Sequence, residues 1–232
     1  RVQPVELAEV LASRTVSTTT YTDTNTLDIA GAKVTSLTLT STGGTNAVTL
    51  TNTGTKLDTL TIKGDKALTV TENLAALKTI NAADATGNVT VNASSANAAL
   101  AFTGGSGNDK IALAASTLVN TQVLNGGSAG TDTVVLADTS LNATQITAAN
   151  TALKNIDILG FNGATIAQGL STITAVSQFS IEGAMTGATT TGTATSGTAA
   201  AGGIAADFSG QSNAQSFVIN ANLTGGNGQA SS

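Results

Sequence analysis

Three consecutive segments of the chain decide its fold: KVTSLTLTSTGGTNAVTLTNTGT from Lys33, KLDTLTIKGDKALTVTENLAA from Lys56, and LKTINAADATGNVTVNASSANAA from Leu77. They begin 23 and 21 residues apart. Each segment holds two short runs in which apolar residues alternate with Thr or Asn, and the two runs are separated by Gly, Asp, Asn or Lys. A recurring unit of this length is the signature of a repeat architecture.

The alternation within each run has the period of a half-buried β-strand. It places the large aliphatic residues on one face and leaves Thr, whose β-branched side chain suits a strand, on the other face. The sequence therefore predicts two strands per unit, with these side chains pointing inward: Leu37, Leu39, Leu60, Ile62, Leu68, Val70, Val89 and Val91.

One unit alone cannot bury its apolar face, whereas stacked units share a continuous core. The predicted fold is therefore all-β: a β-solenoid in which residues 33–136 form stacked coils of about 20–23 residues. An antiparallel β-sandwich is the alternative, because it also combines short strands with polar turns. We favour the solenoid because the strand spacing within each unit changes little.

Signals for helices are few, and one or two short helices are expected. Pro4 stands at a plausible first turn of PVELAEVLA (residues 4–12), and SLNATQITAANTALKNI (residues 140–156) has apolar residues three to five positions apart. We divide the chain into a lead-in segment (1–32), a first repeat region (33–140) and a second repeat region (141–232). Within the last, residues 183–203 form an uncharged low-complexity stretch expected to be a long loop or a flexible edge that contributes little to the core.

The composition excludes several functional classes. With no His and no Cys, the chain lacks the residues for disulfides, zinc sites of the N/S type and Ser-His-Asp or Cys-His catalysis. The net charge is −5, and no basic cluster is present to bind nucleic acid. No apolar run is long enough to span a membrane. Scattered Asp residues favour turns over paired catalytic carboxylates, so no enzymatic activity is expected.

One sequence motif contains residues that can bind a metal ion. Residues 104–112, GGSGNDKIA, match the nonapeptide G-G-x-G-x-D-x-U-x, in which U is a large apolar residue. A second copy begins 22 residues later at Gly126, with one residue inserted before its third glycine, and a third at Gly225 has Ala230 in place of the Asp. Glycine-rich turns can present main-chain carbonyls, and the Asp adds a carboxylate; such oxygen ligands favour Ca²⁺.

These turns resemble the RTX calcium-binding repeats of secreted Gram-negative proteins. The resemblance implies that one Ca²⁺ lies between stacked turns, held by carbonyls and by Asp109 and, with the insertion as a difference, Asp132. Tandem RTX repeats are usual in the family, whereas here the spacing equals one coil, so Gly104 and Gly126 are expected on the same edge of adjacent coils. The candidate calcium-binding residues are Gly104, Gly105, Ser106, Gly107, Asn108, Asp109, Gly126, Gly127, Ser128, Gly130 and Asp132.

Over roughly residues 30–232 the chain, rich in Thr, Ala and Gly, resembles the surface-layer (S-layer) proteins of Gram-negative bacteria. That resemblance implies type I secretion, a location on the cell surface, calcium-dependent self-assembly with identical subunits and possible contact with lipopolysaccharide. A repeat segment of a secreted RTX adhesin is the alternative, although few aromatic residues are present for a binding platform. Lysines at unit corners, Lys56, Lys63, Lys66 and Lys78, either pair with surface phosphate or deter edge-to-edge aggregation.

Overall fold

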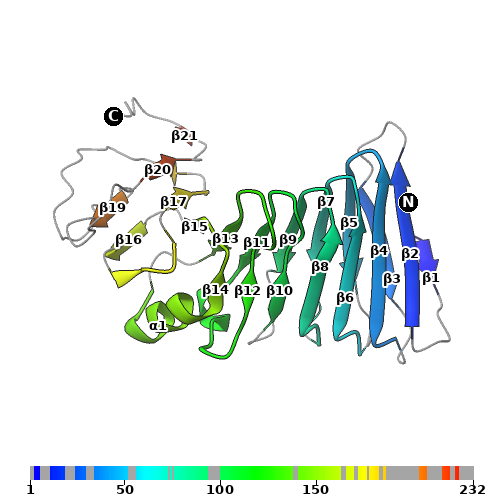
Figure 1. Cartoon of the computed structure of the whole chain (residues 1–232), viewed down its shortest axis with the longest axis horizontal. Coiled ribbons are helices and arrows are strands. Elements are labelled where there is room, and N and C mark those ends of the chain that lie inside the picture. Colours follow the sequence, from blue (N-terminus) through cyan, green and yellow to red (C-terminus); the bar gives the residue numbers. More distant parts are fainter. Residues whose placement is uncertain are drawn as a thin grey trace.

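In the computed structural model of the chain, two parallel β-sheets face each other and each coil gives one strand to each sheet (Figure 1). The structure describes residues 3–5, 11–18, 24–29, 34–51, 56–72, 74, 76–93, 100–137, 141–162, 166–169, 172–176, 178–182, 185–186, 204–207, 216–219 and 223–224. Every strand pair among these residues is parallel, so the β-solenoid is confirmed and the antiparallel sandwich is wrong.

The larger sheet of the described residues has ten strands. In spatial order they are β1 (Gln3–Val5), β3 (Thr24–Ile29), β5 (Asn46–Thr51), β7 (Leu68–Glu72), β9 (Val89–Ala93), β11 (Lys110–Leu113), β13 (Thr133–Leu136), β15 (Ile158–Phe161), β17 (Gln178–Ile181) and β20 (Ser216–Ile219). The other sheet has seven: β14 (Leu153–Lys154), β12 (Leu124–Asn125), β10 (Ala101–Thr103), β8 (Thr79–Ala85), β6 (Thr59–Gly64), β4 (Ser36–Gly43) and β2 (Leu11–Thr18).

Equivalent residues of successive coils lie directly above one another. In the seven-stranded sheet, one row runs through Leu37, Leu60, Ile80, Phe102, Leu124 and Leu153. In the ten-stranded sheet, another runs through Val48, Val70, Val91, Ile111, Val134, Leu159 and Phe179. These rows are buried and meet between the sheets as the core. The inward residues predicted from the alternation are all at most 1% exposed, and the intervening Thr face outward.

The helix expected near residues 140–156 is α1 (Ala143–Ala152). Asn142 and Gln145 form a capping box at its start, and Ala148, Ala149 and Ala152 pack against the solenoid. A 3₁₀ turn, Ala115–Thr117, precedes β12.

The helix predicted over residues 4–12 is wrong at both of its ends, and residues 6–10 lie outside the described residues. Its first residues lie in β1 and its last in β2, and both strands pair in parallel with later coils. β1 is the outermost strand of its sheet, a position where a proline without an N–H costs no ladder hydrogen bond, so Pro4 fits there. The pairing of β1 with β3 therefore outweighs a weak local helix signal.

Two short pairs of strands lie toward the C-terminus: β16 (Ile166–Gly169) with β19 (Ile204–Asp207), and β18 (Met185–Thr186) with β21 (Leu223–Thr224). Apart from β18, the predicted loop 183–203 lies outside the described residues, as does the third glycine-rich turn at 225–230. No helix among the described residues is long and apolar enough to cross a membrane.

Candidate metal centre

The first two glycine-rich turns stack directly on each other at the edge of the solenoid. A Cβ built on Gly104 would lie 2.0 Å from the carbonyl oxygen of Gly126, and one built on Gly127 would lie 2.1 Å from that of Gly105. A Cβ built on Gly130 would likewise lie 2.1 Å from the carbonyl oxygen of Gly107. Such close approach of two backbones requires glycine. The inserted residue of the second copy is thereby placed between Gly127 and Gly130.

A column of three aspartates runs along this edge, immediately before β11, β13 and β15. The main-chain N–H of Asp109 donates to Oδ1 of Asp132 at 2.7 Å, and that of Asp132 donates to Oδ2 of Asp157 at 2.8 Å. Val89, one coil earlier, donates its N–H to Oδ1 of Asp109 at 2.7 Å. Each carboxylate thus caps the strand start of the neighbouring coil.

The carboxylate of Asp109 is enclosed within the first turn. Asp109 is 1% exposed, and its Oδ2 accepts a second hydrogen bond, from the N–H of Gly105 at 2.6 Å. Burial raises the pKa of this carboxyl, and the hydrogen bonds from Val89 and Gly105 oppose that shift because they favour the charged form.

Asp132 is equally buried, at 3% exposed, but its turn is arranged differently. Gly127, the counterpart of Gly105, donates its N–H to Oδ1 of Asn125 at 3.1 Å instead of to the aspartate. Oδ2 of Asp132 consequently accepts no hydrogen bond from a described residue. Burial, opposed by the Asp109 N–H and reinforced by the charges of Asp109 and Asp157, raises the pKa of Asp132 to about 6.

An open depression of about 450 Å³ lies beside the second turn. Its lining comes from two coils: Gly127, Ser128, Ala129, Gly130 and Asp132 from one, and Asn155, Ile156 and Asp157 from the next. Asn155 has φ of 49°, and its side chain donates to Oδ1 of Asn125 at 3.0 Å and to the carbonyl of Gly127 at 3.3 Å. The amide of Asn155 therefore links the second glycine-rich turn to the following coil.

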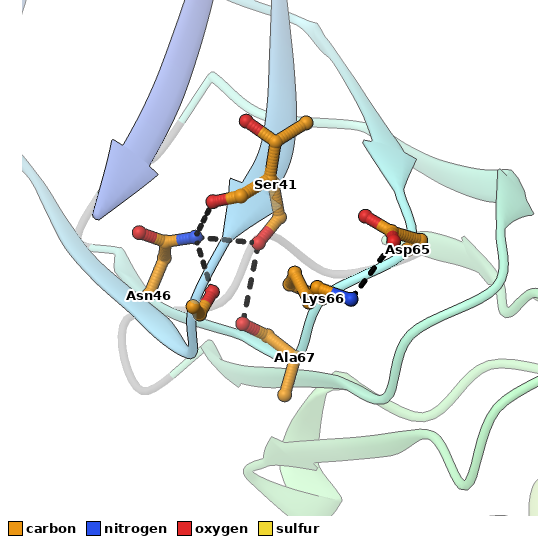
Figure 2. Close-up of polar contacts among 7 residues, drawn as sticks. Ser41, Asn46, Asp65, Lys66 and Ala67 are labelled. Carbon is orange, nitrogen blue, oxygen red and sulfur yellow. Dashed lines mark hydrogen bonds and ion pairs between the residues drawn. The ribbon is translucent and has the colours of Figure 1, made fainter. Parts of the chain in front are cut away.

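In the two coils before Asp109 the same column position carries Val89 and Leu68, and in the coil of β5 it carries an amide instead of a carboxylate. Asn46 occupies it, and its Nδ2 donates to Oγ of Ser41 and to the carbonyls of Thr42 and Gly44 (Figure 2). Here carbonyl oxygens converge on a donor, whereas at Asp109 N–H groups converge on an acceptor. The corner at Asn46 is therefore closed by neutral hydrogen bonds, and those at Asp109, Asp132 and Asp157 involve negative charge.

Of the predicted site residues, the glycines and both aspartates are brought together at one edge. Asn108 joins them through a ladder, because its N–H donates to Oδ1 of Asn88 and its Oδ1 accepts from the N–H of Thr131. Ser106 and Ser128 contribute main-chain N–H groups to the carbonyls of Ala85 and Gly105. No cluster of three or more Asp or Glu side chains suited to a metal occurs among the described residues.

Sequence reasoning missed Asp157 and Asn155, which belong to a turn without the double glycine. A signal was present: Asp157-Ile158-Leu159 repeats the D-x-U pattern of Asp109-Lys110-Ile111. Two of the corner lysines form exposed ion pairs, Lys63 with Asp84 at 2.8 Å and Lys66 with Asp65 at 2.9 Å (the latter in Figure 2).

Comparisons of the chain with protein-family models, with curated proteins and with solved structures found no match.

Proposed function

We propose that the chain is a structural segment of a calcium-dependent bacterial surface layer, in which Ca²⁺ binds at the stacked glycine-rich turns. The observation that carries the proposal is the column of Asp109, Asp132 and Asp157 on consecutive coils, next to turns whose glycines bring neighbouring backbones together. Ion pairs among the described residues involve other carboxylates, so no Lys or Arg neutralises this column.

A calcium ion supplies the missing positive charge. Each carboxylate oxygen has two lone pairs, so an oxygen that accepts an N–H bond retains one for a metal. Ca²⁺ accepts six to eight oxygen ligands in irregular geometry, and main-chain carbonyls of the turns are available to complete its shell. An ion shared by Asp109 and Asp132 would therefore join the first turn to the second and remove the repulsion between their charges.

The fold suits a lattice subunit. Its outer faces carry rows of Thr, Ser and Asn with few charges, and its sheets extend along one axis (Figure 1). A rod stiffened by bound ions has a fixed shape, which allows regular contacts between identical copies. In this proposal the chain is secreted, assembles on the cell surface and is anchored there by lipopolysaccharide. The second candidate function is a repeat segment of a secreted RTX adhesin, which the same rod would serve as a spacer.

Electron microscopy of the negatively stained 232-residue chain, with excess calcium and with a chelator, tests the proposal. Ordered two-dimensional arrays that form with calcium and dissolve with chelator are the expected result. The Asp109→Asn variant should fail to form arrays, whereas Asp58→Asn should form them, because Asp58 lies outside the column. Calcium binding by dispersed single rods would favour the adhesin function. Absence of calcium binding would reject both functions in their calcium-dependent form.

A further inference from the structure

We propose that Asn125 is a site of covalent modification: its side-chain amide is lost through attack by the main-chain nitrogen of Gly126, which leaves an aspartyl or isoaspartyl residue. Asn125 ends β12 and lies on the outward face of the seven-stranded sheet, where it is partly exposed. The chemistry requires only water and is therefore independent of the proposed calcium function.

The reaction has two stages. The main-chain nitrogen of Gly126 loses its proton and forms a bond to Cγ of Asn125, the bond from Cγ to Nδ2 breaks, and ammonia leaves with that proton. Water then opens the resulting cyclic imide. Cleavage between Cγ and the nitrogen gives Asp, whereas cleavage between the main-chain carbonyl carbon and the nitrogen gives isoaspartate, in which the chain runs through Cβ and Cγ. Nothing is oxidised or reduced.

The first argument is the residue that follows Asn125. Glycine has no Cβ to obstruct the approach of its nitrogen to the preceding side chain. The stacking of the coils requires glycine here for another reason, because a Cβ on Gly126 would lie 2.1 Å from the carbonyl oxygen of Asn155. Close packing therefore maintains the residue that makes Asn125 reactive.

The second argument is the hydrogen bonding of the amide. Oδ1 of Asn125 accepts from the N–H of Gly127 at 3.1 Å and from Nδ2 of Asn155 at 3.0 Å. Two donors on this oxygen stabilise the negative charge that develops on it when Cγ is attacked. The leaving atom, Nδ2 of Asn125, donates to none of the described residues.

The attacking nitrogen is held by a hydrogen bond that must open. The Gly126 N–H donates to the carbonyl oxygen of Lys154 at 2.9 Å. Among the described strands β14 is the outermost of its sheet, and its pair with β12 is only two residues long. Such a pair can open locally while the rest of the solenoid stays folded. The reaction is therefore expected in the folded chain.

Asn81 provides an internal comparison. It lies in the same outward row two coils earlier, and its Oδ1 likewise accepts the N–H of the second residue after it, Ala83, at 3.0 Å. Asn81 is more exposed than Asn125, but it is followed by Ala82 and belongs to β8, which is paired on both sides. Asn81 should therefore keep its amide.

Formation of isoaspartate would weaken the stack at the second turn. The carbonyl oxygen of Asn125 accepts the N–H of Gly104 at 2.8 Å, and in isoaspartate that carbonyl becomes a carboxylate outside the main chain. The main chain also gains one atom directly before Gly126 and Gly127, whose backbones approach neighbouring coils closely. The modified protein should therefore lose thermal stability.

Incubation of the full chain in mildly alkaline buffer with chelator, followed by peptide mass spectrometry, tests the proposal. In the folded chain the peptide with Asn125 should acquire the mass of the acid at least about tenfold faster than the peptide with Asn81. It should also become a substrate of protein isoaspartate methyltransferase. Separate peptides report the other Asn-Gly pairs, at Asn162 and Asn227. Asn125→Gln, which would have to close a larger ring, should keep its amide and lose less melting temperature than the unaltered chain.

Circular dichroism verifies that each protein is folded at the start, and a parallel incubation in urea removes the pairing of Gly126 with Lys154. Conversion of Asn125 in urea alone would overturn the proposal, because the β12–β14 pair would then protect the amide. Equal rates at Asn125 and Asn81 in the folded chain would overturn it as well. With chelator present throughout, neither result bears on the proposed calcium function.

Discussion

The main-chain N–H of Asp109 donates a hydrogen bond to Oδ1 of Asp132, 2.7 Å away on the next coil. The aspartate of one turn thus holds the strand start of its neighbour, and the relation repeats from Asp132 to Asp157. Stability and the proposed ion binding at this edge are therefore expected to be coupled, because a change to one carboxylate affects two coils. The predictions below separate the two effects.

Asp109→Asn should reduce the calcium response of the melting temperature. A ligand that binds only the folded state stabilises it by about 2.7 kcal/mol at a hundredfold excess over its dissociation constant. The variant should lose most of that gain. It should also be less stable in chelator, by about 1–3 kcal/mol, because an amide offers one acceptor oxygen where Val89 and Gly105 require two.

Asp58→Asn is the control for this comparison. The side chain of Asp58 accepts a hydrogen bond from the hydroxyl of Thr59 in a turn outside the column. Its melting curves should shift with calcium as those of the unaltered protein do. Equal calcium responses in the Asp109 and Asp58 variants would show that the ion is elsewhere.

Gly105→Ala should destabilise the calcium-free protein by about 1–3 kcal/mol. A Cβ at this position would lie 2.0 Å from the carbonyl oxygen of Ala85, and backbone cannot move aside as a side chain can. Ser106→Ala alters the neighbouring exposed residue and should change stability by no more than about 0.5 kcal/mol. Urea denaturation measures both; similar small losses would mean that the two coils are not in close contact here.

Glu72→Gln should remove a pH dependence of stability. Glu72 is 2% exposed, its Oε2 accepts the N–H of Leu74 at 2.6 Å, and burial raises the pKa of its carboxyl above 4.5. The folded state therefore holds this proton to higher pH than the unfolded state does. Its contribution to stability is full below pH 4.5 and is lost as pH rises through the folded-state pKa.

Denaturation of both proteins in chelator, from about pH 4 to about pH 8, tests this contribution. Relative to the unaltered protein, the free energy of unfolding of the Gln variant should increase as pH rises through the folded-state pKa of Glu72. The difference should then stay constant at higher pH. Asp84→Asn should show no such change between about pH 4 and about pH 8, because Lys63 lowers the pKa of Asp84 below 3.8 and its contribution is lost only on further acidification. A Gln variant whose stability follows that of the unaltered protein at every pH contradicts the assignment.

Lys110→Met should destabilise the protein by about 2 kcal/mol. The ammonium of Lys110 lies 2.7 Å from Oε2 of Glu182, whose side chain is only 14% exposed and packs over Gly160. Removing the cation leaves that carboxylate partly buried without its ionic partner. Lys66→Met is the matched change at the exposed pair with Asp65 and should cost no more than about 0.5 kcal/mol. If Lys110→Met and Lys66→Met lost the same stability in thermal denaturation, the carboxylate of Glu182 would have to be as exposed to solvent as that of Asp65.

The sequence predicts the solenoid because the determinants are local and repeated. Leu37 and Leu60 stand in equivalent positions of adjacent units, and the structure pairs them directly. The same reasoning places Gly104 beneath Gly126, because the distance between the motifs equals one coil. In a repeat protein the pairing register can be predicted by aligning the units, whereas the sequence of a β-protein without repeats does not show it.

Features that depend on exchanged hydrogen-bond partners are not predictable in this way. The sequence around Asp132 differs from that around Asp109 by the inserted residue and by Asn125 in place of Thr103, but neither difference predicts that the Gly127 N–H bonds Asn125 and leaves the second oxygen of Asp132 without a described donor. Asp157 escaped notice because its turn lacks the glycines that define the motif. At its first residues the predicted N-terminal helix was wrong for a related reason, since the pairing of β1 with β3 is a contact between segments more than 20 residues apart.

The stacking of each coil on its immediate neighbours has a kinetic consequence. Strands that pair are mostly 20–25 residues apart, so the formation of each coil closes only a short loop. Each coil can therefore fold onto a neighbouring coil that is already formed. Unfolding is then expected to begin at the two ends and move inward, with several partly folded species in place of one concerted transition. A bound ion in the middle of the rod would act as a stop that halts this fraying and as the point from which refolding spreads.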